Sequence, residues 1–206
     1  MNKGKFVFAQ LASLVTRYEF EKCVLRHQGD YKVQEFSCWN QFLCMIFGQL
    51  THRESARYII TCLKAHQNKV YHLGIKQIVS HSTLTRANEN RSWQIYADFA
   101  VHLIAIVRPL YKNDNEFVYD IENAVYALDS TTIDLCLSVF KWARFRKKKG
   151  AIKMHTLLDL RGSIPTMIYV SDGKKHDVNI LDDIEIKTDA FYLWTKGIPT
   201  LPDYLK

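Results

Sequence analysis

The sequence predicts an α+β protein, in which an all-helical N-terminal domain precedes a small mixed sheet. Up to about Pro109, apolar residues recur at intervals of three and four positions with few turn-forming residues between them. A polar, turn-prone segment follows at residues 111–123. After it, short runs of β-branched and aromatic residues alternate with turn signals. We therefore place a domain boundary near residue 115, between a helical domain at residues 1–115 and a sheet domain at residues 116–194.

The bulk composition supports a folded protein without a membrane span or a disulfide framework. Of 206 residues, 48% are hydrophobic and 13% aromatic, enough to bury a core. The five cysteines are scattered and form no C-x-x-C pair, which favours a reducing, cytoplasmic setting over disulfides or a zinc knuckle. Phe8, Leu11, Val15 and Tyr18 sit at helical spacing, so we expect an amphipathic helix there; a signal peptide is the alternative.

Two helix starts are visible in the helical domain. Thr51 opens THRE, which has the form of a capping box in which Thr51 and Glu54 bond each other's backbone amides. A second helix is expected from near Ser82, after the loop through Gly74.

The second of these helices is a candidate DNA-binding element. It carries Thr83, Arg86 and Asn88, and two helices joined in this way can form a helix-turn-helix that presents polar side chains to a groove. The alternative is an ordinary helical bundle with a polar, solvent-exposed face. Arg86 is the candidate contact to DNA.

The sheet domain predicts three strands, a helix and a fourth strand. The strands are expected at residues 124–128, 151–160, 164–170 and 190–194, and the helix at residues 176–186. Asp172-Gly173 forms a turn before the helix.

The positive charge of the chain is concentrated in one segment, which we call the basic run (residues 141–153). It holds seven Lys or Arg and no acid, while the remaining residues carry 21 basic and 21 acidic side chains. A solvated loop is one explanation. Clustered cations also gain affinity by releasing counterions from a phosphate backbone, so we predict a polyanion partner.

Asp129 is the candidate metal ligand. It ends the apolar run at residues 124–128, and an acid at the end of the first strand of such a sheet is typical of a ribonuclease-H-like metal site, in which carboxylates hold two divalent ions. One acid cannot hold two hard cations. A turn or a helix cap at Asp-Ser-Thr is the alternative.

Long blocks of the sequence resemble a known family. ALDSTTIDLCLSVFKWARFRKKKGAIKMHTLLDLRGSIP and DGKKHDVNILDD are similar to the catalytic core of bacterial insertion-sequence transposases of the DDE superfamily, the family conventionally numbered four. FAQL, CWNQFLCMIFGQLTHRES and STLTRANENR resemble the helical domain that precedes that core. The resemblance covers the chain up to about Tyr192.

The resemblance implies a function and a set of site residues. It implies a partial ribonuclease-H-like core, Mg²⁺ or Mn²⁺ as cofactor, and double-stranded DNA at the terminal repeats of the element as substrate. It makes Asp129 the first acid of the catalytic triad. It also allows a homodimer, or a dimer with a full-length transposase. The expected DNA-binding residues are Arg144, Arg146, Lys147, Lys148, Lys149, Lys153 and Arg86.

The resemblance breaks after the fourth strand. The family has an apolar residue and then Asp-Arg-Gly-Tyr, whose Asp is the second metal ligand, but here Thr195 holds the ligand position. The third acid, a Glu in a later helix, has no counterpart in the 206 residues. Reading the codons of Trp194 and Thr195 one base earlier forces an Asp. We therefore expect residues 195–206 to be an out-of-frame tail and the chain to be a truncated, inactive transposase.

Several other residues have an open role. Asp172 and Asp177 are acids that Asp129 could borrow, and Asp134 is a spare ligand or a solvated acid. His155 and Asp159 fall on one strand face and are expected to be structural or to face DNA.

Overall fold

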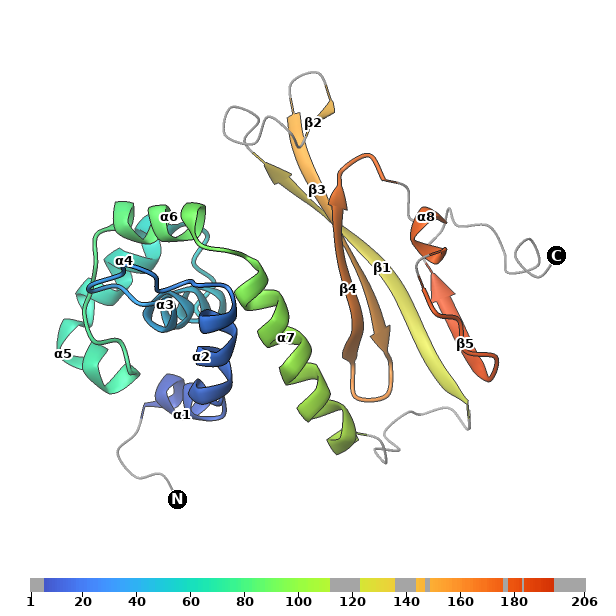
Figure 1. Cartoon of the computed structure of the whole chain (residues 1–206), viewed down its shortest axis with the longest axis horizontal. Coiled ribbons are helices and arrows are strands. Elements are labelled where there is room, and N and C mark those ends of the chain that lie inside the picture. Colours follow the sequence, from blue (N-terminus) through green and yellow to red (C-terminus); the bar gives the residue numbers. More distant parts are fainter. Residues whose placement is uncertain are drawn as a thin grey trace. The chain divides into compact units, whose positions relative to one another are not determined.

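The computed structural model describes residues 6–111, 123–135, 144–146, 149–175, 178–182 and 184–194. Contacts divide the chain into two units, Met1–His102 and Leu103–Lys206 (Figure 1). The boundary that we expected near residue 115, and the tail at residues 195–206, lie outside the described residues.

The first part of the chain is helical, as predicted. Its order is α1 (Val7–Ser13), α2 (Arg17–Arg26), α3 (Cys38–Leu50), α4 (Ala56–Ala65), α5 (Gln67–Val70), η1 (Tyr71–Leu73), α6 (His81–Asn90), α7 (Gln94–Val107) and η2 (Arg108–Tyr111). No helix in the described ranges is both long enough and apolar enough to cross a membrane.

Two of the predicted helix features are wrong. The expected amphipathic helix through Phe8 and Tyr18 is two helices, because the chain breaks between α1 and α2. Thr51 is not an N-cap: it ends α3, where its hydroxyl donates to the Phe47 carbonyl at 2.6 Å. The N-cap of α4 is Ser55, whose Oγ accepts from the Tyr58 amide at 3.3 Å. Serine is as good an N-cap residue as threonine, and Ser55, four residues after Thr51, takes this role instead.

The core of the helical unit is an aromatic cluster. Phe20 of α2 is fully buried, and its ring centroid lies 4.9 Å from that of Phe42 on α3 and 5.1 Å from that of Phe99 on α7. Edge-on and tilted contacts at these separations stabilise beyond the area they bury. These rings therefore fix α2, α3 and the first half of α7 together.

A buried polar network ties α6 to α3. Arg91, after α6, donates to Gln41 Oε1 at 2.7 Å and to the Phe36 carbonyl. Gln41 in turn donates to Asn88 Oδ1 at 2.5 Å. Because Gln41 is buried, losing any of these partners leaves a desolvated polar group unsatisfied.

The second unit is built on a mixed sheet. Its elements are β1 (Ala124–Leu135), β2 (Arg144–Arg146), β3 (Lys149–Asp159), β4 (Ile164–Asp172), α8 (Val178–Leu181) and β5 (Ala190–Trp194). The spatial order is β2-β3-β1-β5, and β4 also pairs with β3. β3 runs antiparallel to β1 and to β4, whereas β5 runs parallel to β1 (Figure 1). The predicted α+β class is confirmed. The structure has one strand more than the three predicted before the helix, because β2 lies between the first and second predicted strands.

The element lengths differ most from the predictions at β1 and α8, and the bounds of β3 and β4 differ by one or two residues. β1 continues to Leu135 instead of ending at residue 128, because the β-branched residues Thr131, Thr132 and Ile133 extend its pairing with β3. The described helix α8 covers only four residues of the expected eleven. β5 coincides with the predicted strand.

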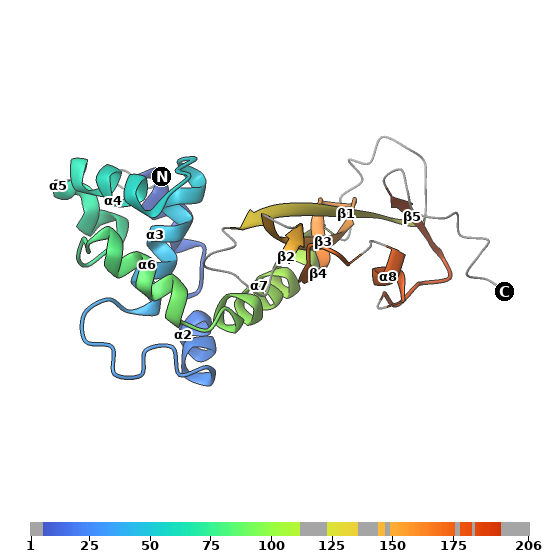
Figure 2. The ribbon, with the colours of Figure 1, turned by 90° about the horizontal axis from the view of Figure 1, so that it is seen from above.

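The sheet has two different faces. On one, which we call the α8 face, Tyr126, Leu128 and Leu157 are buried with Ile180 and Leu181. Figure 2 shows α8 to one side of the strands. The opposite face, which we call the open face, carries exposed apolar side chains. These are Ile133, Ile168, Val170, Phe191 and Leu193.

Candidate functional site

Asp129 lies within β1, on the open face of the sheet. Its neighbours in the strand, Leu128 and Ser130, belong to the α8 face, because successive side chains of a strand alternate. The Asp129 side chain is exposed, and the residue opposite Asp129 on β3 is Thr156. The carboxylate therefore stands in solvent on a strand that the rest of the sheet holds in place.

The acids that we considered as partners for Asp129 lie far from it. Asp172 pairs with Ile152, four residues along β3 from Thr156, which corresponds to about 14 Å at roughly 3.4 Å per residue. Asp159 lies on the α8 face and accepts from the Arg161 amide at 3.0 Å. Asp177 lies outside the described residues.

The metal chemistry predicted for this site needs more ligands than it has. Two divalent ions about 4 Å apart require several oxygen ligands. Within the described residues, no three His, Cys, Asp or Glu side chains gather where they could hold a metal ion. The donor set described around Asp129 does not fit a pair of Mg²⁺ ions.

β5 pairs with the part of β1 that directly precedes Asp129. The parallel register runs from Ala124 opposite Ala190 to Leu128 opposite Trp194. The described pairing ends there. Thr195, at the position where the resemblance expects the second acid, lies outside the described residues.

The described parts of the basic run lie on β2 and at the start of β3, which pair antiparallel, and we call these two strand segments the basic hairpin. Arg144 of β2 pairs with Gly150 of β3, and Arg146 pairs with Lys149. Lys153 follows on β3, on the α8 face, and is half-buried. The other two predicted DNA contacts, Lys147 and Lys148, lie outside the described residues.

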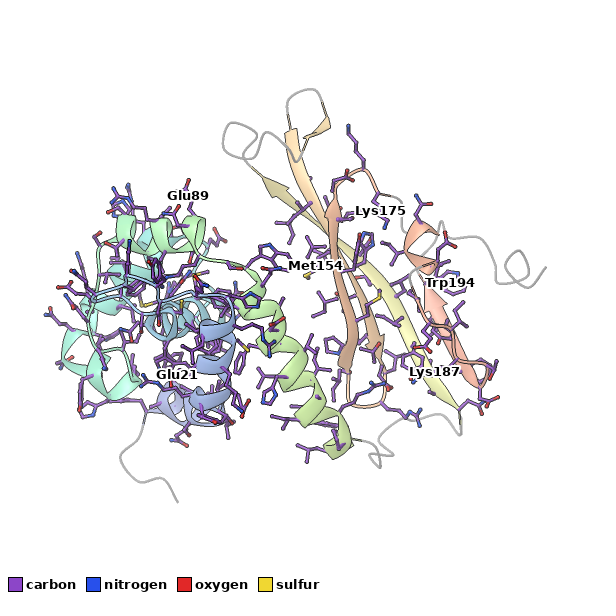
Figure 3. The ribbon with its side chains drawn as sticks, in the orientation of Figure 1. Glu21, Glu89, Met154, Lys175, Lys187 and Trp194 are labelled. Atoms are coloured by element: carbon purple, nitrogen blue, oxygen red, sulfur yellow. The ribbon has the colours of Figure 1, made fainter. Side chains whose placement is uncertain are left out.

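Two further cations, Lys174 and Lys175, follow the predicted Asp172-Gly173 turn. The turn at residues 172–175 follows β4, and its Gly173 amide donates to the Ala151 carbonyl at 2.9 Å. Lys174 and Lys175 therefore follow a residue bonded to Ala151 of β3, which is next to the Gly150 that pairs with Arg144 of β2. Figure 3 labels Lys175. The signal in the sequence was Lys-Lys directly after Asp-Gly.

The expected helix-turn-helix is not supported in its simple form. α4 and α6 are in contact, but α5 and η1 lie between them in the chain, in place of a turn of three or four residues. Asn88 accepts from Gln41, so its side chain serves the polar network instead of a groove. Arg86 is exposed on α6 and remains the candidate contact there.

The buried thiols offer no nucleophile. Burial raises the pKa of Cys44 to about 12, and burial together with a hydrogen bond to Asp30 raises the pKa of Cys38 to about 12. At neutral pH both are therefore neutral thiols that pack in the core.

Comparison with known proteins gives one match. The sequence profile of a domain of unknown function (DUF4372) matches residues 3–76, which span α1 to η1 and the start of the following segment. No curated protein and no solved structure matches the chain.

Proposed function

We propose that the chain derives from a DDE transposase of an insertion sequence and binds the double-stranded DNA of the element's terminal repeats. The domain whose profile matches residues 3–76 is found in transposase-like proteins, which supports this origin. Asp129 lies on the first strand, β1, which pairs with β3, and the resemblance makes it the first acid of the catalytic triad. The basic hairpin supplies cations for phosphate.

We expect this chain to bind DNA without cutting it. Transposases of this type act by metal-dependent hydrolysis and strand transfer with Mg²⁺ or Mn²⁺, but the described donors around Asp129 do not fit the ion pair. The observation that carries this conclusion is the placement of the described candidate acids: Asp159 lies on the opposite face from Asp129 and Asp172 lies four residues further along β3. The sequence has Thr195 where the resemblance expects the second acid.

The second candidate function is a non-catalytic DNA-binding remnant that inhibits a full-length transposase. Such a chain would act in the cytoplasm, by occupying terminal repeats or by forming a mixed dimer with the active enzyme. The exposed apolar side chains of the open face, among them Phe191 and Leu193, favour association with another chain.

DNA binding and DNA cleavage can be tested side by side. We expect a labelled terminal-repeat duplex to be retarded in a gel, with an affinity that falls steeply as salt rises, and no nicking in Mg²⁺ or Mn²⁺. Cleavage that Asp129→Ala abolishes would show an active enzyme and overturn the inactive assignment. Equal affinity for DNA and for an uncharged polymer would overturn the proposal of DNA binding itself.

A third measurement separates the remnant from an inhibitor. Titration of this chain into a transposition assay with the full-length enzyme should lower the yield of joined product. An unchanged yield, with DNA binding intact, leaves the remnant without an inhibitory role.

A further inference from the structure

The corner of the helical unit where α5 passes into η1 presents two ring side chains to solvent. Val70 and Leu73 are buried and anchor this corner to the core. Gly74 ends the turn in the left-handed region, at φ +81°, and its amide donates to the Tyr71 carbonyl at 3.0 Å. Tyr71 and His72 lie between the two anchors and are both exposed, Tyr71 to 79%.

These two rings form a row with a third, which comes from the residue before α1. The ring centroids of Tyr71 and His72 are 5.9 Å apart, and those of His72 and Phe6 are 6.1 Å apart. Contacts between rings at these separations are favourable and hold the row together. Phe6 is itself 38% exposed. We call Phe6, His72 and Tyr71 the ring row.

Two hollows open beside the ring row. One, of about 310 Å³, is lined by Tyr71, His72, Gly74 and Lys76. The other, of about 340 Å³, lies between α1, α3 and η1 and also has His72 and Gly74 in its wall. Because Gly74 has no side chain, a planar ligand can approach the backbone closely here.

The chain around the ring row carries positive charge without acids. Residues 55–88 contain five Lys or Arg and no Asp or Glu. Three of the five, Lys64, Lys69 and Lys76, are exposed on α4, on α5 and just after η1. Lys69 Nζ lies 5.4 Å from the centre of the Phe6 ring. None of these three lysines is ion-paired with an acid in the part of the chain that the structure describes.

Rings and lysines together match the two parts of a nucleotide. Exposed aromatic faces stack on nucleobases whatever their sequence, because every base has a π face, and lysines bind the phosphates that join them. In a duplex each base is stacked between its neighbours, so its faces are not accessible. Only unpaired nucleotides offer both groups at once.

We propose that the ring row, together with Lys69 and Lys76, binds unpaired nucleotides of DNA. The inference rests on the proposed DNA binding and deepens it, because it assigns single-stranded DNA to a surface of the helical unit that the basic run does not contain. All five residues lie within residues 3–76, the segment that the domain profile matches.

The test compares variants of the full chain in binding to a fluorescein-labelled oligothymidylate of about ten nucleotides, measured by fluorescence anisotropy. Tyr71→Ala removes a stacking face and should weaken binding by about fivefold or more. Tyr71→Phe keeps the ring and should bind as the native chain does. Tyr31→Ala is the matched control and should also bind normally. Tyr31 is 69% exposed in the same unit and lies beside Lys32, but it belongs to the segment between α2 and α3.

An abasic strand of the same length separates stacking from charge. It carries the same phosphates without bases, so the native chain should bind it more weakly than oligothymidylate. Tyr71→Ala should bind the abasic strand as the native chain does. Lys76→Gln should reduce the slope of log Kd against log salt for oligothymidylate by about 0.7, the value for one lost phosphate contact on a single strand.

The results distinguish this inference from the proposed function. If the native chain binds duplex DNA but not oligothymidylate, or if Tyr71→Ala binds oligothymidylate as tightly as the native chain, this inference fails and DNA binding stands. Equal affinity of the native chain for the abasic strand and for oligothymidylate would also overturn it, because the surface would then recognise charge alone. If the native chain binds neither duplex nor single strand, both fail.

Discussion

Asp129 shows how one residue can be well placed and still insufficient. Its carboxylate is exposed on a paired strand, and the residue opposite is Thr156. The strand therefore presents a first ligand, and the resemblance expects a second acid at the position that the sequence fills with Thr195.

The first prediction restores that second acid. Thr195→Asp should tighten Mn²⁺ binding by at least about tenfold, because a site with two carboxylates neutralises a divalent ion better than one. Mn²⁺ binding can be measured by electron paramagnetic resonance. Asp129→Ala in the Thr195→Asp background is the control and should return the affinity to that of the native chain. Equal affinity in all three proteins would mean that positions 129 and 195 are not neighbours.

A second residue-scale prediction concerns Ser171. Ser171→Ala leaves the fully buried His155 without the acceptor of its Nε2 proton, and an unsatisfied buried donor costs about 1–3 kcal/mol. We expect the free energy of unfolding in urea to fall by that amount. Ser163→Ala, at an exposed position in the turn before β4, is the comparison and should change it by less than about 0.5 kcal/mol.

At the scale of the element, the types of the longer strands and helices were predictable, whereas several of their ends were not. β5 was predicted residue for residue, because AFYLW is bounded by polar residues before it. β1 was predicted too short, because the polar residues from Asp129 to Thr132 indicate the end of a strand. Pairing with β3 instead extends β1 to Leu135. Such cross-strand pairing cannot be seen in a local window.

The candidate site was predictable to a similar degree. Asp129 and the basic run stand out by charge against their surroundings, and the structure places them on neighbouring strands. Lys174 and Lys175 follow Asp-Gly in the sequence, but their position beside β3 could not be predicted, because it depends on the bond from Gly173 to Ala151, twenty-two residues away in sequence.

The cap of α4 gives the element-scale prediction. Ser55→Ala should lower the free energy of unfolding by about 1 kcal/mol, because the Tyr58 amide loses its acceptor. Glu54→Ala, which removes the acid of the capping box suggested by the sequence, should have little effect in the same urea titration. A larger loss from Glu54→Ala than from Ser55→Ala would reinstate Thr51 as the cap.

At the scale of the whole molecule, the clustered positive charge and the exposed apolar side chains of the sheet favour contacts with different partners. Concentrated cations draw the protein to polyanions. Exposed side chains on the open face, such as Ile168, Val170, Phe191 and Leu193, favour contact between chains. DNA affinity and self-association should therefore respond to different substitutions.

The prediction at this scale concerns self-association. Leu193→Lys places a charge on the open face, where the native side chain is 54% exposed, and should reduce aggregation without a large loss of stability. Dynamic light scattering over a concentration series measures it. Leu14→Lys, at a 79% exposed leucine of the helical unit, is the control. An equal effect of both substitutions would mean that net charge alone, and not the open face, governs aggregation.

The parallel pairing of β5 with β1 has a consequence for synthesis of the protein. Ala124 and its partner Ala190 are 66 positions apart, whereas β3 and β4 are joined by a short turn. Closing a long loop costs more entropy than forming a hairpin, so the hairpin can assemble while the ribosome is still adding residues. One edge of β1 therefore stays unpaired until β5 has been synthesised. An unpaired edge with apolar side chains favours aggregation with neighbouring chains during that interval.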